Sequence, residues 1–489
     1  MTLVVVPLAE SDPNKLIERC SQARAAGADA VEVRLDLALK AGGSAEAIFS
    51  SFAWLSLPII VTIRHASEQG AWKGDEGARL HLYARADTAG AAWVDRELAH
   101  HTVRPWRPTR AKLILSHHDF TGMGKDLPAV VSAMRAARAD LCKIAVTATD
   151  AADLDRVRQL IDGKGPVAAM AMGEHGVPSR LLAGVWNSAL TFARLPGDAG
   201  SAVGQPAIDE LISLYRIKQQ TTATKVYGVI GSPIAHSLSP LVHNAAFSAH
   251  KINAVYVPFL VTNAPAFWKT CGDWIQGLSI TIPHKQALQA LVGSQDDLGK
   301  RIGAMNTIYR NGTATVGANT DADAIRRCSE RALCGELRGK KALVLGAGGA
   351  GRAAVCALQD AGAEVAVANR TLTRAEELAR ELGGLRLVAW EALAKERFDL
   401  LVNMTSVGLK APTETPWPHK LPESSAVFDS VYNPLETKLI VDAKAAGCRV
   451  VPGLDMFLDQ ACAQFKLWTN HEAPADVMRA LCVQRLTKS

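Results

Sequence analysis

The sequence lacks a long apolar run, and no stretch approaches the roughly 18 apolar residues that a membrane-spanning helix needs. We therefore expect no membrane span. The first ten residues, MTLVVVPLAE, lack the basic region and the long apolar core of a signal peptide. Because they begin directly in a strand pattern, they also argue against a transit peptide. These features together predict a cytoplasmic protein.

Paired cysteines and blocks of like charge are also missing. The nine cysteines are scattered and none forms a C-x-x-C pair, which predicts reduced thiols and neither a disulfide framework nor a zinc site. The formal net charge of +6 is spread along the chain without a Lys/Arg block, so we expect no nucleic-acid partner. A mild positive excess suits small anionic substrates, and the composition leaves the oligomeric state open.

The sequence does contain alternating strand and helix patterns. Its 489 residues predict two to four domains at roughly 150 residues per domain. Eight strand–helix units in the first part favour a (β/α)8 barrel, although a doubly wound open sheet would show the same alternation. The expected strands are 4–8, 30–36, 58–64, 93–98, 112–118, 141–147, 166–172 and 190–195.

The segment after the eighth strand, 197–211, is rich in glycine and is either a linker or a lid over a site. A helical stretch at 208–220 and the polar tract TTATK follow, so we place the domain junction near 220–225. New strand–helix patterns begin there, and two amphipathic helices close the chain. The expected domains are 1–220, 225–335 completed by 456–489, and 336–455.

A glycine-rich turn lies between the strand pattern 341–345 and a helical pattern. It fits G-x-G-x-x-G in the required context, where glycines let the backbone approach a pyrophosphate at a helix N-terminus. A glycine-rich turn without a ligand is the alternative. The expected dinucleotide contacts are Gly346, Gly348, Gly349, Ala350 and Gly351.

The end of the next strand indicates which dinucleotide binds. NAD favours an Asp or Glu there for its ribose, whereas this chain has Asn369-Arg370-Thr371, with Arg374 one turn further on. Guanidinium groups suit a 2′-phosphate. These residues therefore predict NADP, the alternative being that both arginines are solvated residues of a helix start.

The first part also holds a lysine in an unusual place. Lys143 lies in the strand pattern LCKIAVT between apolar neighbours, where a charge is costly unless it is functional or paired. Desolvation would lower its pKa and make it a nucleophile towards a ketone. A lysine that reaches solvent from a strand end is the alternative.

Other charged residues of this part fit a polar barrel mouth. Glu32 and Arg34 share one face of a strand, and Arg64, which ends another, precedes Glu68 by four residues. Arg180 follows the turn GEHGVPS, and several arginines at one site imply a substrate with a carboxylate. His117 and His118 point to opposite faces, so a single active-site histidine is favoured over a metal site.

The C-terminal part carries GSPIAHSLSPLVHN, ITIPHK, GAMNT, GANTD, NMTSVG, DSVYNP and GLDMFLDQA in order, and over 225–489 it resembles shikimate dehydrogenase. The resemblance implies that Lys285 and Asp321 form the catalytic pair, which suits protonation of an alkoxide left by hydride transfer. It assigns substrate binding to Ser237, Ser239, Thr281, Asn306, Asn319 and Gln460. It assigns further cofactor contacts to Thr405, Tyr432 and Gly453.

The N-terminal part carries EVRLD, TIRHASEQG, SHHDF, CKIAV, MGEHGVPSR and SAVGQP, and over about 1–218 it resembles type I 3-dehydroquinate dehydratase. The resemblance implies that Lys143 forms a Schiff base with the substrate ketone, that His118 moves the proton, and that Glu68 orients His118. It favours a lid over a linker at 197–211. It implies that substrate is bound by Glu32, Arg34, Arg64, Arg180, Ser201 and Gln205.

The two resemblances imply consecutive reactions, from 3-dehydroquinate to 3-dehydroshikimate and then, with NADPH, to shikimate. The implied fold class is α/β, with an N-terminal (β/α)8 barrel followed by a two-lobed dehydrogenase that contains a Rossmann-like NADP domain. Ser279, Met305 and Pro7 depart from the residues common in these families. The alternatives are a quinate dehydrogenase in the second half, or a non-catalytic ligand-binding module in one half.

Overall fold

The computed structural model describes residues 1–200, 202–409, 411–417, 419–423 and 425–487. The chain divides into two compact units, Met1–Lys225 with Asn253–Asp273, and Val226–Ile252 with Trp274–Ser489. In the described part of the chain, no helix is long and apolar enough to span a membrane.

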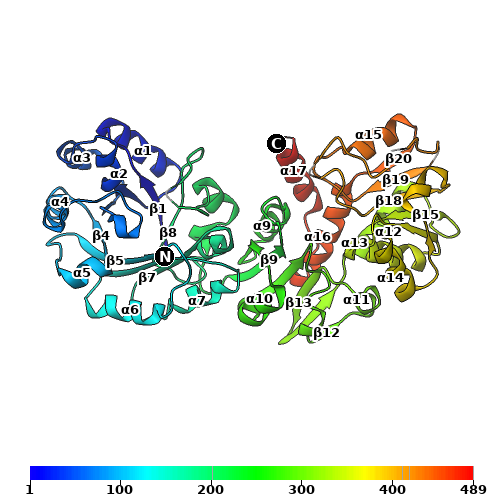
Figure 1. Cartoon of the computed structure of the whole chain (residues 1–489), viewed down its shortest axis with the longest axis horizontal. Coiled ribbons are helices and arrows are strands. Elements are labelled where there is room, and N and C mark those ends of the chain that lie inside the picture. The colour runs from blue at the N-terminus through cyan, green and yellow to red at the C-terminus, as the bar shows by residue number, and fades with distance from the viewer. Residues whose placement is uncertain (201, 410, 418, 424, 488–489) are drawn as a thin grey trace. The chain divides into compact units, whose positions relative to one another are not determined.

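All eight strands expected in the first part form one parallel sheet (Figure 1). Its order, β7-β6-β5-β4-β3-β2-β1-β8, follows the chain and joins β1 to β8. The backbone N–H of Ala189 donates to the carbonyl of Val167 over 2.8 Å, which links the last two strands. The sheet is therefore a nearly closed barrel and not a doubly wound open sheet. The strands are β1 (Leu3–Leu8), β2 (Ala30–Arg34), β3 (Ile59–Thr62), β4 (Trp93–Glu97), β5 (Lys112–Asp119), β6 (Leu141–Thr147), β7 (Val167–Met172) and β8 (Leu190–Phe192).

Helices cover the outside of the barrel. Asp12, Asp75 and Asp126 precede three of them and accept hydrogen bonds from their first-turn N–H groups. Apolar residues such as Val5, Ile60 and Ile114 fill the barrel interior, so polar side chains are left to the strand ends. The helices are α1 (Pro13–Ala25), α2 (Leu35–Lys40), α3 (Ala45–Ser51), α4 (Glu76–Thr88), α5 (Leu98–Val103), α6 (Leu127–Ala136), α7 (Asp153–Gln159) and α8 (Val177–Leu181).

The helical stretch expected at 208–220 is helical but is not one continuous α-helix. The segment forms a π-helical turn at Glu210–Leu214 and a 3₁₀ turn at Ile217–Gln219. Arg216 between them has a left-handed backbone with φ of 51°, which interrupts a right-handed helix.

A mixed sheet follows the barrel in the chain, in the order β10-β9-β11-β13-β14-β12. Its strands are β9 (Lys225–Gly231), β10 (Ala254–Leu260), β11 (Ile275–Ile280), β12 (Ser294–Gln295), β13 (Thr307–Asn311) and β14 (Ala314–Ala318). The helices of this part are α9 (Ser239–Ala249), α10 (Ala264–Cys271), α11 (Asp297–Ile302) and α12 (Asp321–Leu333).

A third sheet is wholly parallel, in the order β17-β16-β15-β18-β19-β20. Its strands are β15 (Lys341–Leu345), β16 (Glu364–Ala368), β17 (Arg386–Leu387), β18 (Leu400–Asn403), β19 (Ala426–Asp429) and β20 (Arg449–Val451). Helices α13 (Gly349–Asp360), α14 (Leu372–Leu382) and α15 (Lys438–Ala445) belong to it. The last helices, α16 (Gly453–Thr469) and α17 (Ala475–Leu486), pack on β13 and α9 of the mixed-sheet lobe (Figure 1).

Candidate active sites

A buried polar cluster occupies the barrel towards the carboxyl ends of β2 to β6. Lys143 lies inside the barrel, only 4% exposed, so it is not a lysine that reaches solvent from a strand end. Its Nζ lies 2.7 Å from Asp95 Oδ2 and 3.5 Å from Glu32 Oε1. The same nitrogen lies over the Phe192 ring, 4.5 Å from the ring centroid. A lysine nitrogen is thus held among acids in an otherwise apolar interior.

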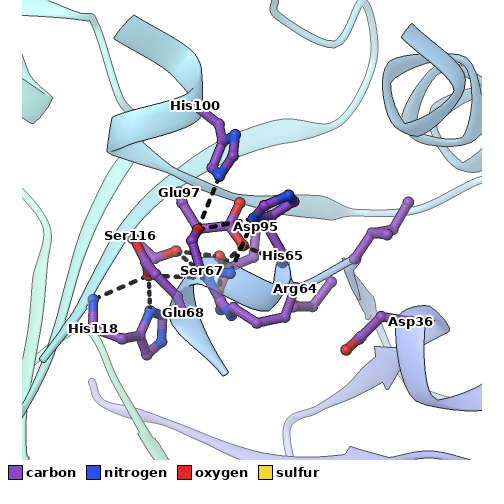
Figure 2. A network of polar contacts seen from close by, with 12 residues as sticks. Asp36, Arg64, His65, Ser67, Glu68, Asp95, Glu97, His100, Ser116 and His118 are labelled. Atoms are coloured by element: carbon purple, nitrogen blue, oxygen red, sulfur yellow. Dashed lines mark hydrogen bonds and ion pairs between the residues drawn. The ribbon is translucent and has the colours of Figure 1, made fainter. Parts of the chain in front are cut away.

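Asp95 is the centre of this cluster, although the sequence patterns did not single it out. It accepts hydrogen bonds from Ser116 Oγ over 2.6 Å and from Arg64 over 3.2 Å (Figure 2). It also accepts one from Lys143. Burial alone would raise the pKa of Asp95, but the charges of Arg64 and Lys143 outweigh it and hold the pKa well below its ordinary value. Asp95 is therefore a fixed anion beside Lys143.

His118 and Glu68 form a second pair in the same cluster (Figure 2). The Glu68 Oε2 atom lies 2.7 Å from His118 Nδ1 and accepts the backbone N–H of His118 over 3.2 Å. An oxygen that accepts the backbone N–H favours Nδ1 as a second donor, which leaves Nε2 with a free lone pair. This is the tautomer that a general base needs.

The protonation of this pair is set by burial. Burial, and then the charges of Arg64 and Lys143, lower the pKa of His118 well below 6.5, so the imidazole is neutral at neutral pH. Burial raises the pKa of Glu68 to about 7 against the opposing charge of Arg64. The two groups titrate as a coupled pair whose working form carries one shared proton.

Arg180 is the remaining cation of the barrel mouth. It is 2% exposed, and no carboxylate among the described residues pairs with it. Its Nη1 donates to the sulfur of Met170 over 3.4 Å, and burial lowers its pKa to about 10. A buried cation without a counter-ion is costly, so the site is built for an anionic ligand.

Three other residues expected at the barrel site have their own contacts within the protein. Arg34 pairs with Asp36 over 2.9 Å, and Glu32 accepts the Thr62 hydroxyl over 2.8 Å. Gln205 is 8% exposed, and its backbone carbonyl accepts from Arg194. Ser201 lies outside the described residues.

The mixed-sheet lobe brings together the expected catalytic pair. Lys285 Nζ forms an ion pair with Asp321 Oδ2, and the Asn306 carboxamide donates to Asp321 Oδ1 over 2.8 Å. Asp321 begins α12 and is 4% exposed. Asn306 also donates to Thr320 Oγ1 over 2.9 Å and accepts the Thr320 N–H over 2.8 Å. Asp321 is thus fixed from both of its oxygens.

Two residues expected to bind substrate form hydrogen bonds to other groups of the protein. Asn319 Oδ1 accepts the Asp321 N–H over 3.0 Å and its amide donates to the carbonyl of Ala304. Gln460 donates to the carbonyl of Phe457 over 2.9 Å. The Ser237 hydroxyl accepts the N–H of Ser239, which begins α9, and Thr281 follows β11.

Gln464 supports this site and was not expected from the sequence. Its Oε1 accepts the Ser279 hydroxyl over 2.7 Å, while its amide donates to Thr307 Oγ1 and to the Asn306 carbonyl. Ser279, one of the departures noted above, is therefore integrated into a buried network. A glutamine at the middle of a C-terminal helix gives no sequence signal for this contact.

The glycine turn has the geometry of a pyrophosphate cradle. Gly346 has φ of 107°, and a Cβ on Gly351 would lie 2.1 Å from the Gly346 carbonyl oxygen. The Ala347 N–H donates to Asn369 Oδ1 over 3.1 Å, which ties the turn to the end of β16. Gly349 begins α13, and a Cβ there would lie 3.2 Å from Lys285 Cβ. The cradle therefore adjoins Lys285.

The remaining expected cofactor residues surround this turn. Arg370 and Arg374 are exposed at the start of α14, and in the described ranges no carboxylate pairs with either. Thr371 precedes α14 and its carbonyl accepts from Asn369. Thr405 follows β18, where its hydroxyl donates to Asn403 over 2.7 Å. The ring centroids of Tyr432 and Phe457 lie 4.8 Å apart. Gly453 begins α16. Cations without an acidic partner in the described ranges, beside a glycine-rich turn at a helix N-terminus, fit NADP.

Comparison with known families assigns both halves of the chain. The model described as type I 3-dehydroquinase matches residues 4–222. The shikimate dehydrogenase substrate binding domain matches 229–308, shikimate / quinate 5-dehydrogenase matches 329–408, and the shikimate 5′-dehydrogenase C-terminal domain matches 453–482.

The names of proteins similar to this chain agree with these family matches. The chloroplastic bifunctional 3-dehydroquinate dehydratase/shikimate dehydrogenase of Arabidopsis thaliana is 36% identical over 97% of this chain and 83% of its own length. An NADP(+) shikimate dehydrogenase of Moorella thermoacetica is 42% identical over 53% of this chain and 93% of its own. A solved shikimate dehydrogenase in complex with NADP+ matches 54% of this chain and 97% of its own with a TM-score of 0.50 and 32% identity.

Proposed function

Since the chain belongs to the family of bifunctional 3-dehydroquinate dehydratases/shikimate dehydrogenases, we propose which of its residues perform the two reactions. The first site spans a domain of residues 1–220. The second uses a substrate domain of 225–335, completed by 456–489, and an NADP domain of 336–455. The cofactor is NADP. We place the protein in the cytoplasm because all nine cysteines are free thiols.

In the dehydratase, Lys143 is the nucleophile. Its Nζ adds to the ketone of 3-dehydroquinate and water leaves, which gives an iminium beside the fixed anion Asp95. His118 Nε2 takes the C2 proton, and the electron pair moves to the iminium nitrogen. When the pair returns, the hydroxyl leaves as water with the proton from His118, and hydrolysis frees Lys143. Arg180 holds the substrate carboxylate, because it is a buried cation that no carboxylate among the described residues pairs with.

In the dehydrogenase, the pair Lys285 and Asp321 handles the proton. NADPH, when bound, supplies a hydride to the ketone of 3-dehydroshikimate. Lys285 donates a proton to the oxygen that becomes the hydroxyl, and Asp321 orients the lysine through their ion pair. Asn306 holds Asp321 from its second oxygen. Ser237, Ser239 and Thr281 line the substrate side, whereas Asn319 and Gln460 act by fixing the backbone around it.

The buried Lys143 Nζ carries the proposal for the first site, and borohydride trapping tests it. In the presence of 3-dehydroshikimate, reduction of the iminium is expected to leave one stable adduct. Mass spectrometry of proteolytic fragments should place it on Lys143. An adduct on another lysine, or none at saturating ligand, would contradict the Schiff base at this residue.

The dehydratase should be sensitive to pH through Glu68. The working pair needs the Glu68 carboxylate, and burial raises its pKa to about 7. The kcat/KM of the dehydratase is therefore expected to fall as the pH drops through about 7. Glu68→Gln should lower kcat about 10²- to 10⁴-fold. A Glu68→Gln enzyme with wild-type kcat at neutral pH would show that His118 needs no anionic partner.

Cofactor choice should depend on Arg370 and Arg374. Replacing both by glutamine is expected to raise the KM for NADPH about ten- to hundredfold, the value of a charge-assisted hydrogen bond or two. The KM for NADH should not rise. Arg380→Gln, at the other end of α14, is the matched control. Equal losses with both dinucleotides would place the 2′-phosphate elsewhere.

A further inference from the structure

Two histidines outside the reacting groups brace the turn that carries Glu68. Ser67 Oγ lies 2.8 Å from His65 Nδ1 and 3.2 Å from His100 Nε2 (Figure 2). The centroids of the two imidazole rings are 4.2 Å apart. Both rings are partly exposed, so solvent protons reach them. The mechanism above uses neither histidine.

His65 is the N-cap of the 3₁₀ turn Ala66–Glu68. Its backbone N–H donates to Glu97 Oε1 over 2.8 Å, and its carbonyl accepts the Gly70 N–H over 2.9 Å. The loop is tight, since a Cβ on Gly70 would lie 1.9 Å from the Arg64 carbonyl oxygen. Glu68, the last residue of the turn, reaches His118 from this frame. The cap on the turn thus bears on the position of the Glu68 carboxylate.

The hydrogen bonds of this brace require a neutral His65. The Ser67 backbone N–H, which can only donate, lies 3.1 Å from His65 Nδ1, so Nδ1 is the acceptor and carries no proton. The Ser67 hydroxyl can then donate its one proton to Nδ1 and accept from His100 Nε2. A proton on His65 Nδ1 would remove both bonds from Ser67 at once.

We propose that His65 is a positioning residue for Glu68 and that it acts only as a neutral imidazole, so protonation of His65 releases the turn and slows the dehydratase. The inference rests on the proposed role of Glu68 as the partner of His118. It adds a second, independent proton to the acid side of the dehydratase pH profile.

Charged groups on two elements face the His100 ring. Glu97 on β4, and Glu76 and Arg79 on α4, surround His100, with Glu76 Oε2 3.7 Å from His100 Nδ1. Burial, and then the charge of Arg79, lower the pKa of His100. Two positive charges on rings this close repel each other. Glu97 also lies beside His65, because its Oε1 accepts the His65 backbone N–H.

Profiles of dehydratase kcat/KM between about pH 5 and 8, where histidines titrate, test this on the full chain. The wild type should fall with a log–log slope of about one for Glu68, and protonation of His65 should add a further drop of about fivefold, as for a lost N-cap. His65→Asn supplies an N-cap acceptor that does not titrate, so it should lack the further drop and keep the midpoint at about 7. His65→Ala should lose about fivefold in kcat/KM at pH 8, as for a typical lost N-cap.

Two controls separate the possible failures. His100→Gln keeps a donor to Ser67 and should retain the further drop of about fivefold. The dehydrogenase rate of each variant reports how much intact chain is present, and a thermal unfolding scan reports whether the barrel is folded. A further drop of about fivefold that persists in His65→Asn, or wild-type activity of His65→Ala at every pH, would overturn the proposal. A wild-type chain without dehydratase turnover at any pH would instead contradict the proposed function itself.

Discussion

Replacing Lys143 by methionine is expected to lower dehydratase kcat by about 10⁴-fold or more, as when a covalent nucleophile is removed. Methionine keeps the length and the packing of the side chain, but no iminium can form. It also leaves Asp95 as a buried anion with Arg64 as its remaining cationic partner. The dehydrogenase activity of the same chain should not change, and both rates are measured on one sample.

The chain offers a matched control in Lys112→Met. Lys112 is also a barrel-strand lysine, but it begins β5 and is exposed. It should retain wild-type dehydratase activity. Full dehydratase turnover in Lys143→Met would rule out Schiff-base chemistry at this residue, and equal losses in both lysine variants would point to damage of the barrel rather than of the reaction.

The second large effect is expected in the other half of the chain. Asp321→Ala should lower the rate of hydride transfer about 10²- to 10⁴-fold, because Lys285 loses the carboxylate that orients it. Asn306 loses its acceptor at the same time. Affinity for NADPH should change much less, since Asp321 lies in the substrate lobe. Single-turnover rates and fluorescence titration with NADPH separate the two quantities.

Asp323→Ala is the matched control for this prediction. Asp323 lies in the same first turn of α12, but it is about two-fifths exposed (43% of its side chain) and pairs with Arg326 and Arg327 on the surface. It should leave both quantities unchanged. An equal loss of hydride transfer and of NADPH affinity in Asp321→Ala would mean that the residue supports the cofactor site and not the proton transfer.

The strands and the nucleotide turn could be predicted because their signals are local. Apolar runs such as LCKIAVT alternate with helical patterns, and the glycine turn lies directly between β15 and α13. The continuous helix at 208–220 could not be excluded in this way, because the break comes from the left-handed backbone of Arg216. Arginine carries no local signal for that conformation.

Asp95 and Gln464 could not be predicted because register, and not sequence, gives them their roles. The pairs Thr62–Asp95 in β3–β4 and Ser116–Lys143 in β5–β6 set the barrel staggering that brings Asp95 beside Lys143. Gln464 meets Ser279 across 185 residues of chain. The strand pattern WVDREL gave one weak hint, since Asp95 and Glu97 fall on the same face of a strand.

The most direct test of the two-reaction account is NADPH consumption by the purified chain with 3-dehydroquinate as its only substrate, followed by identification of the product. The account predicts that NADPH is consumed and that shikimate is formed, because the first site must supply the ketone that the second reduces. Consumption with quinate as the product would show that the second site bypasses the first. No consumption, with both 3-dehydroquinate and 3-dehydroshikimate, would contradict the account.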